Sequence, residues 1–269
     1  MLSKLFHALN REAHFTRDVL AVGATEIRKA TYASKGTYFV AFTALATGLE
    51  RMGKLCLILD SSILDKASPT PHRVRTFRHN ISGLYTATTE IVLSRSISPT
   101  HLADLNDELH QSILRCLTSF AEGDRYANID LLSGRPNTND SIAMWAEQVD
   151  QLIAERLVPK KRKDQINERA RVISQVLGSH SMVLHVSEEG QDITDLEVAS
   201  RLTGLNEAIA PIRQLLVMQI IRYWVEVLVE LQYMAMKSGN DDIPYLAEVF
   251  AIFLNSDQYI KTRKTWTRL

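Results

Sequence analysis

The sequence has little cysteine, glycine or proline, and it has no excess of charge of either sign. Its 269 residues include 2 cysteines, Cys56 and Cys116, too few for the disulfide framework of a secreted domain. Lys plus Arg and Asp plus Glu number 31 each, so no global basic field exists to hold nucleic acid non-specifically. Any nucleic-acid binding must therefore come from local basic patches, and a neutral chain also fits self-association or a protein partner.

The sequence also lacks an apolar run suited to secretion or to a membrane. The segment MLSKLFHALNREAHF (1–15) contains no apolar stretch long enough for a secretory signal, so we expect a cytoplasmic protein. The most apolar later stretch, LLVMQIIRYWVEVLVEL (215–231), contains Arg222, Glu226 and Glu230. Charges near the centre of a span are costly in lipid. We therefore expect a buried helix there and no membrane association.

Because glycine and proline are scarce and apolar residues recur at helical spacing, the sequence predicts an all-α fold. The clearest helix has apolar residues alternately three and four positions apart: Tyr38, Phe42, Leu45, Leu49, Met52, Cys56 and Leu59. Such a seam buries Cys56, which we expect to be an unreactive thiol. The linker signal SGRPNTND (133–140) divides the prediction into a helical bundle over 1–135 and a helical C-terminal region over 136–269, packed on the first.

Other helices are expected over seven further segments: 11–34, 71–93, 99–122, 140–157, 162–177, 204–237 and 242–255. Ser98 is suited to cap the third of them, with Pro99 at its first position. Pro211 should bend or start the helix over 204–237. Only SMVLHVSEEGQDITDLEV (181–198) has strand character, and it predicts a small β-hairpin that turns at Glu189-Gly190.

Three segments of the first half occur in an order and at a spacing typical of a known helical family. GTYFVAFTALATGLERMGKLCLILD (36–60) has Glu50 one turn before Lys54, RHNISGLY (78–85) contains His79, and DRYANIDLL (124–132) contains Arg125. Together they resemble the HEPN domain, a small helical module of many prokaryotic conflict, toxin–antitoxin and nucleotide-binding proteins. The chain departs from the family's His-Asp-Leu stretch, because Asn80 and Ile81 follow the histidine.

The resemblance implies a metal-independent ribonuclease in which an arginine is followed by a histidine four to six residues later, and in which two copies converge on one cleft. An imidazole can move the proton of the RNA 2′-hydroxyl, and a guanidinium can hold the phosphate oxygens. No histidine follows Arg125 at that spacing. Asp130 is a weak base near neutral pH because Arg125 favours its ionised form. The alternative is that Arg125 and Asp130 form a structural ion pair or hydrogen-bond loop contacts.

The arginine–histidine spacing occurs elsewhere, at Arg73–His79 and at Arg95–His101, although chance accounts for two such pairs. Arg95–His101 straddles Pro99, which disfavours a shared helical face. Arg73–His79 lies in the basic cluster HRVRTFRH (72–79), whose alternative is a solvated basic face. The candidate catalytic residues are therefore Arg125, His79 and Arg73, and the candidate phosphate-binding residues beside them are Arg75 and Arg78.

Two other basic segments are candidates for contact with RNA or with an acidic partner. VPKKRKDQINERAR (158–171) starts a predicted helix with cations, which do not suit the positive end of the helix dipole unless a partner offsets them. YIKTRKTWTRL (259–269) interleaves cations with aromatic rings, as in base stacking, although Trp266 can instead dock on the core. The candidate RNA-binding residues of these segments are Lys160, Lys161, Arg162, Lys163, Arg263, Lys264 and Trp266.

The remaining polar patterns favour structural roles. A polar stripe on the apolar helix over 204–237 indicates either its wet edge or a seam in a dimer interface: Gln219, Arg222, Glu226 and Glu230. His180 and His185 lie near two glutamates but lack a third ligand that the sequence can place, so we expect no metal and no cofactor.

Three functions follow as alternatives. The first is a non-catalytic, RNA- or partner-binding module, expected to be a homodimer, in the bacterial conflict or defence setting that the resemblance implies. The second is a dimeric ribonuclease that uses His79 with Arg73, Arg75 or Arg125. The third is a structural helical scaffold. Arg125 and His79 within hydrogen-bond reach in one open cleft would favour the ribonuclease, whereas burial of Arg125 would favour a structural role.

Overall fold

The computed structural model of the chain describes residues 2–65, 74–135, 139–240 and 242–267. The predicted all-α fold is confirmed, because the described elements are helices apart from one two-stranded hairpin. The α-helices are α1 (Lys4–Glu26), α2 (Lys35–Asp65), α4 (Ile81–Ser94), α5 (Glu108–Glu122), α6 (Ala127–Leu132), α7 (Ser141–Trp145), α8 (Gln151–Arg156), α9 (Lys160–Leu177), α10 (Leu196–Lys237), α11 (Leu246–Phe250) and α12 (Asp257–Thr262). Short 3-10 turns are η1 (Tyr32–Ser34), η2 (Asp124–Tyr126), η4 (Gly178–His180) and η5 (Ala251–Phe253), and η3 (Ala146–Asp150) is a π-helical turn.

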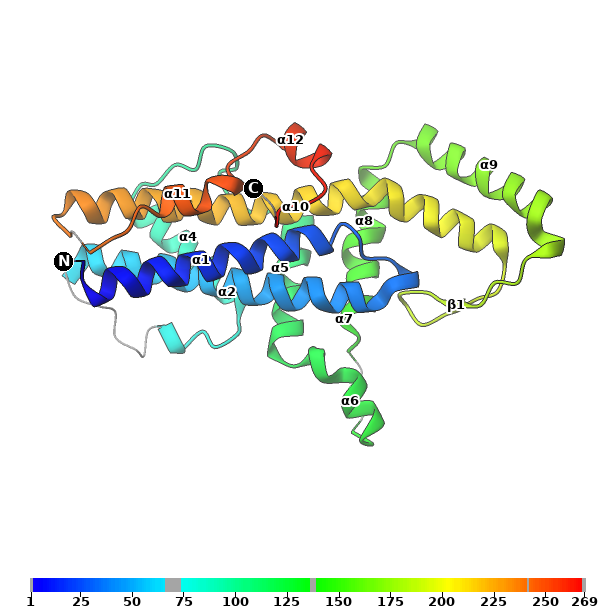
Figure 1. The fold of residues 1–269 in the computed structure, drawn as a ribbon, viewed down its shortest axis with the longest axis horizontal. Helices are drawn as coiled ribbons and strands as arrows, with labels where there is room; N and C mark the ends of the chain where they lie inside the picture. Colours follow the sequence, from blue (N-terminus) through cyan, green and yellow to red (C-terminus); the bar gives the residue numbers. More distant parts are fainter. Residues whose placement is uncertain (1, 66–73, 136–138, 241, 268–269) are drawn as a thin grey trace.

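Helices α1, α2 and the second half of α10 lie along the long axis of the molecule, and α2 packs against both of the others (Figure 1). Two glycines bring α1 and α2 close together. A Cβ atom on Gly23 would lie 2.6 Å from Cγ of Leu45, and one on Gly48 would lie 2.5 Å from Cδ2 of Leu20. Each glycine therefore receives a leucine of the opposite helix, and a larger residue would force the two helices apart.

Both predicted halves of the chain contribute to one hydrophobic core. Its buried residues run from Leu9 in α1 to Trp266 near the C-terminus. The 42-residue helix α10 joins the halves, because it packs on α2 and α5 with one half and on α9 with the other. Pro211 lies inside this helix and does not start it. The linker predicted at 133–140 lies partly outside the described residues, and the division of the chain into two regions at that point stays a prediction.

Helix α9 and the first half of α10 form an antiparallel arm that extends beyond α1 and α2 (Figure 1). The predicted hairpin at the base of this arm is confirmed. Strand β1 (His185–Val186) pairs antiparallel with β2 (Asp192–Ile193), and Gly190 takes a left-handed φ of 85° in the turn. Ile193 is buried against Tyr32, which fixes the hairpin to the end of the helical core.

The prediction that a helix begins at Pro99 was wrong. Helix α5 begins at Glu108, where the side chain of Asp107 accepts a hydrogen bond from the backbone N–H of Leu109 at 2.9 Å. The backbone N–H of Thr100 donates instead to the carboxylate of Glu226 in α10, at 2.6 Å. A side chain from a distant part of the chain therefore satisfies a backbone N–H group that the predicted helix would have included.

The polar stripe of α10 faces other parts of the same chain. Gln219 and Arg222 both donate to the carboxylate of Asp257 in α12, at 2.8 and 2.7 Å, and Glu226 accepts from the backbone of Thr100. Among the described residues, no helix is long and apolar enough to cross a membrane, and α10 with this stripe is no exception.

Candidate functional site

Arg125 lies in neither of the two arrangements that its sequence position suggested. It is exposed in the turn η2, and its guanidinium lies 5.0 Å from the centre of the Tyr126 ring. Within the described parts of the chain, no hydrogen bond or ion pair joins Arg125 to Asp130 or to a histidine. Arg125 is thus neither a buried anchor nor one member of an assembled arginine–histidine pair.

His79 contacts a carboxylate of the same chain. Its Nδ1 atom lies 2.9 Å from Oε2 of Glu50, and Oε1 of the same glutamate accepts from Nζ of Lys54 at 2.5 Å. Lys54 also donates to the backbone carbonyl of Arg78 at 3.0 Å, which holds Arg78 in a left-handed conformation with φ 43°. The Glu–Lys pair of the HEPN resemblance therefore anchors the loop that carries His79. Arg73 lies outside the described residues, and Arg75 is exposed.

The other candidate RNA-binding residues lie on two separate elements. The four cations Lys160, Lys161, Arg162 and Lys163 form the first turn of α9, and Pro159 before them provides no side-chain cap. At the other end of the chain Trp266 is 1% exposed, so its ring is packed in the core and is not available to a base. The guanidinium of Arg263 lies over that ring at 4.7 Å, and Lys264 follows it.

These basic segments do not form one surface. Residues 74–79 precede α4 on one side of the molecule, α9 belongs to the distal arm, and α12 lies across α10 from α2 (Figure 1). A single RNA strand would have to follow a long path to meet all three. The structure therefore directs attention to a different site, to which Lys163 contributes among the candidate residues that the structure describes.

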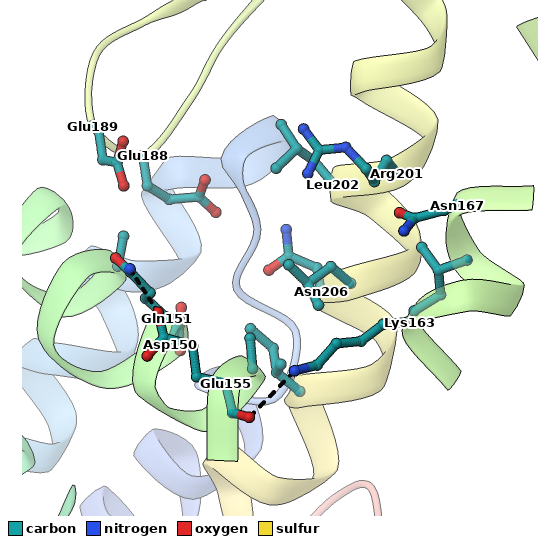
Figure 2. A pocket seen from close by; sticks show the side chains of 15 residues that line it. Asp150, Gln151, Glu155, Lys163, Asn167, Glu188, Glu189, Arg201, Leu202 and Asn206 are labelled. Carbon is teal, nitrogen blue, oxygen red and sulfur yellow. Dashed lines mark hydrogen bonds between the residues drawn. The ribbon is translucent and has the colours of Figure 1, made fainter. Parts of the chain in front are cut away.

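A cavity of about 420 Å³ opens between α8, α9, the first half of α10 and the turn of the hairpin (Figure 2). Its wall is partly apolar and partly polar. The apolar part consists of Ala146, Ala154, Ile166, Leu202, Leu205 and Ile209. The polar part consists of Asp150, Gln151, Glu155, Lys163, Asn167, Glu188, Glu189, Arg201 and Asn206. We refer to this cavity as the Asp150 pocket.

An ion pair between Asp150 and Arg213 lies at the base of the pocket. Nε of Arg213 donates to Oδ1 of Asp150 at 2.8 Å, and Nη2 donates to Oδ2 at 2.5 Å. Nη1 donates to the backbone carbonyls of Ile27 and Ala30, at 3.1 and 2.9 Å, and so caps the C-terminal end of α1. Arg213 is fully buried, so this bidentate pair is a strong and geometrically defined contact.

Asp150 accepts two further hydrogen bonds from aromatic side chains. The indole N–H of Trp145 donates to Oδ1 at 3.1 Å, and the hydroxyl of Tyr38 lies 3.2 Å from Oδ2. Asp150 is the last residue of the π-helical turn η3, which interrupts the helix predicted over 140–157. Insertions of this kind are rare in helices and occur frequently at functional sites. The extra residue shifts the helical register and turns Asp150 toward Arg213.

The protonation states at the base follow from burial and from these partners. Burial raises the pKa of the Asp150 carboxyl, and the Arg213 guanidinium limits that rise. Burial acts to lower the pKa of Arg213, but the Asp150 carboxylate outweighs it and the pKa is raised. Burial also raises the pKa of Tyr38 well above its ordinary value. Tyr38 therefore stays a neutral hydrogen-bond donor at neutral pH, and the two hydrogen bonds from Arg213 favour the charged form of Asp150.

Two side chains carry this polar network into the pocket itself. Glu188, at the turn of the hairpin, has its Oε1 atom 3.3 Å from the Tyr38 hydroxyl, which has one proton to share between Glu188 and Asp150. Asn206 has its Oδ1 atom 3.4 Å from Nη2 of Arg213. Figure 2 shows Glu188 extending from the hairpin and Asn206 extending from α10 toward the centre of the cavity.

Sequence reasoning missed this site because its members are far apart in the chain. Arg213 and Asp150 are separated by 63 positions, and Tyr38 and Asp150 by 112. One local signal was present: Arg213 interrupts an apolar stretch that follows Pro211. A charged residue inside a buried helix needs a partner, and that rule alone would have placed Arg213 among the candidates.

Comparison of the chain with protein-family models, with curated proteins and with solved structures found no match. The function of the Asp150 pocket is therefore argued from its own chemistry.

Proposed function

We propose that the chain is a non-catalytic, HEPN-like binding module that acts in the cytoplasm as a homodimer, and that the Asp150 pocket is its ligand site. A bacterial conflict or defence role belongs to the same proposal, since it follows from the resemblance. The ligand is a small polar molecule with an apolar part. A solution mass of twice that of the chain is the expected result for the dimer.

One observation carries the proposal: a charged pair with fully partnered donors lies at the base of an open cavity. Charges are costly to bury, and a core of apolar residues would be at least as stable. Here the pair orients Asn206 directly, and Tyr38 links Asp150 to Glu188, so that polar atoms of Asn206 and Glu188 face the cavity from a rigid support. Rigid placement of polar groups lowers the cost of binding a ligand. Mixed apolar and polar walls of this volume are typical of small-molecule sites.

The chemistry of the pocket favours binding over catalysis. Among the described residues that line it, none is a histidine, a cysteine or a serine. The phenol of Tyr38 has its pKa raised well above the ordinary value by burial, so it is a poor general base near neutral pH. Each oxygen of Asp150 already accepts from a nitrogen of Arg213 and from an aromatic side chain, so this carboxylate is a poor proton acceptor for a substrate.

The test is a thermal unfolding screen with apolar amino acids, nucleosides, monosaccharides and polyamines. At least one class should raise the midpoint, since a ligand at a hundred times its Kd stabilises a protein by about 2.7 kcal/mol. Leu205→Trp, which places a ring in the cavity, should abolish the shift, and Leu157→Trp, at an exposed leucine outside the cavity, should retain it. If no class shifts the midpoint, or if Leu205→Trp shifts like the unchanged protein, the pocket is not a ligand site.

The ribonuclease alternative has its own test. Purified protein incubated with total RNA should leave it intact, because no described histidine forms a hydrogen bond with Arg125 and His79 contacts Glu50. RNA cleavage that is lost in His79→Ala would replace the present proposal with the nuclease.

RNA binding without cleavage is a second candidate function, and the start of α9 favours it. Four successive cations occupy the first turn of that helix, where no acidic residue and no side-chain cap offsets them. An anionic partner would relieve the unfavourable alignment with the helix dipole. RNA affinity should then fall steeply as salt rises, and the replacement of Lys160 and Lys161 by alanine should reduce that slope. An affinity that does not change with salt would remove this candidate.

A further inference from the structure

Two charges of opposite sign lie on opposite sides of the Asp150 pocket. Glu188 comes from the hairpin and Arg201 from α10, and Figure 2 shows both side chains directed toward the cavity. In the described part of the chain, neither forms an ion pair within 4.0 Å, and Glu188 has only the Tyr38 hydroxyl at 3.3 Å as a partner. A negative and a positive group are thus available to a molecule in the space between them.

Asn206 adds a donor that lines the cavity and has no acceptor among the described residues. The residue is 8% exposed, and its Oδ1 atom faces Nη2 of Arg213 at 3.4 Å. Because a guanidinium only donates, this contact fixes the orientation of the amide and leaves its Nδ2 atom toward the cavity. No described residue accepts from Nδ2. This amide nitrogen is therefore available to an acceptor atom of a ligand in the cavity.

Three other charges at the pocket already have hydrogen-bond partners. Asp150 is paired with Arg213, and Nζ of Lys163 donates to the backbone carbonyl of Glu155 at 3.2 Å. The side chain of Glu155 accepts from Gln151 at 2.8 Å. We assign to a ligand the carboxylate of Glu188, the guanidinium of Arg201 and the amide nitrogen of Asn206. Glu189, next to Glu188, adds to the negative charge on that side of the pocket.

These three groups face an apolar wall. Ile166 of α9 and Leu202, Leu205 and Ile209 of α10 line the same cavity. A ligand that satisfies the polar groups would place its remaining atoms against these side chains, and burial of apolar surface would contribute to affinity.

We propose that the Asp150 pocket binds a free α-amino acid with an apolar side chain. The α-ammonium contacts Glu188, the α-carboxylate contacts Arg201 and Nδ2 of Asn206, and the side chain lies against the apolar wall. This inference rests on the proposed function and names the ligand class of the same site.

Other ligand classes match the pocket less well. A phosphate ester would meet Arg201 but would also face the carboxylates of Glu188 and Glu189, which repel it. A polyamine would meet Glu188 and Glu189 but would be repelled by Arg201 and Lys163. A zwitterion satisfies both charges, and an acceptor on its negative end also satisfies Asn206.

Calorimetric titration of the full chain with L-leucine and L-phenylalanine tests the proposal. N-acetyl-L-leucine removes the positive charge of the ligand, and L-leucinamide removes the negative one. At least one of the two free amino acids should bind, and for leucine each blocked analogue should bind at least tenfold more weakly. Equal binding of the free and blocked forms would overturn the zwitterion assignment.

Two variants assign each end of the ligand. The Glu188→Gln variant should lose the preference for L-leucine over N-acetyl-L-leucine. The Arg201→Gln variant should lose the preference for L-leucine over L-leucinamide. Both positions lie at the mouth of the pocket and outside the core, so folding should persist. Glu197→Gln, an exposed carboxylate of α10 outside the pocket, should bind like the unchanged protein.

The outcomes separate this inference from the proposed function. If both amino acids fail to bind but a nucleoside, sugar or polyamine raises the thermal midpoint, the pocket is a ligand site and the amino-acid assignment is wrong. If no ligand class raises the midpoint, both the amino-acid assignment and the proposed function are wrong.

Discussion

At the scale of single residues, Arg213 has five N–H groups and an acceptor for each. Asp150 takes two of them, the carbonyls of Ile27 and Ala30 take two more, and Asn206 takes the fifth. Complete pairing is the condition under which a buried guanidinium is tolerated. The residue also joins the end of α1 to η3, so its loss would affect two elements at once.

We predict that Arg213→Met lowers the free energy of unfolding by about 3–5 kcal/mol, because Asp150 would remain as an unpaired buried charge. The double variant with Asp150→Leu should be more stable than Arg213→Met alone, since it removes both charges. Urea denaturation measures both effects. Arg125→Met is the control, and at an exposed position it should change stability by no more than about 0.5 kcal/mol. A double variant less stable than the single one would contradict the assignment.

His110 is a second buried residue whose protonation state follows from its contacts. Its Nε2 atom lies 3.0 Å from Oε1 of Gln219, while Nε2 of Gln219 donates to Asp257 at 2.8 Å. The glutamine oxygen therefore faces the imidazole, and the proton of neutral His110 is on Nε2. Its Nδ1 atom is buried without a hydrogen-bond partner among the described atoms. Burial lowers the pKa of His110, against the opposing effect of the Gln219 hydrogen bond.

This lowered pKa predicts a loss of stability in acid. The unfolded chain binds a proton at His110 near its ordinary pKa of about 6.5, before the folded chain does, so the free energy of unfolding falls as pH decreases below that value. Above it the residue is neutral in both states and has no such effect. Urea denaturation at pH 7.5 and 5.5 should show a smaller decrease for His110→Gln than for the unchanged protein. Equal decreases would show that another group is responsible.

At the scale of elements, the contact between α1 and α2 depends on glycines whose neighbours leave no space for a methyl group. We predict that Gly48→Ala destabilises the fold by about 1–3 kcal/mol, since a Cβ atom there would lie 2.5 Å from Leu20. Gly36→Ala is the matched control in the same helix, because no atom lies within 4 Å of its added Cβ. That variant should be neutral or stabilising by up to about 1 kcal/mol, through lower backbone entropy in the unfolded chain.

Denaturant unfolding of both glycine variants provides the measurement. If Gly48→Ala and Gly36→Ala behaved alike, the two helices would not be as close as the structure places them. The polar stripe of α10 belongs to the same scale. Since Arg222 and Glu226 have partners in α12 and in the segment before α5, the stripe is explained by contacts within one chain, and it gives no separate support for a dimer seam.

At the scale of the whole molecule, the C-terminal segment closes the core over α1. The backbone N–H of Trp266 donates to the hydroxyl of Thr25 at 2.9 Å, and Arg28 donates to the carbonyl of Lys261 at 2.9 Å. Helix α1 and the C-terminal segment therefore belong to one core. Helix α10 connects this core to the arm that carries the Asp150 pocket.

We predict that Trp266→Ala lowers the free energy of unfolding by about 3–5 kcal/mol, because it removes a large buried ring. Unfolding should stay a single transition that near-UV and far-UV circular dichroism report together. Tyr259→Ala, at a half-exposed ring of the same segment, should cost less. If Trp266→Ala had no effect on stability, the indole would not be in the core, and its availability for base stacking would have to be reconsidered.

The sequence by itself determined the features that repeat over a few residues. The seam from Tyr38 to Leu59 is buried, Cys56 within it is buried with its pKa raised by burial, and the hairpin turns at Gly190. Each depends on helical period or on local backbone freedom, which neighbouring residues decide together. The predicted start at Pro99 failed where Glu226, distant in the chain, binds the backbone.

Only the tertiary structure decided which distant side chains meet. It placed Arg125 in solvent, Trp266 in the core, and Asp150 beside Arg213 at the base of a pocket. An ion pair across 63 positions leaves no periodic signal in the sequence, because it depends on how whole helices pack. The same packing sets the dielectric around each charge, and so decides whether a polar residue is a solvated surface group or part of a binding site.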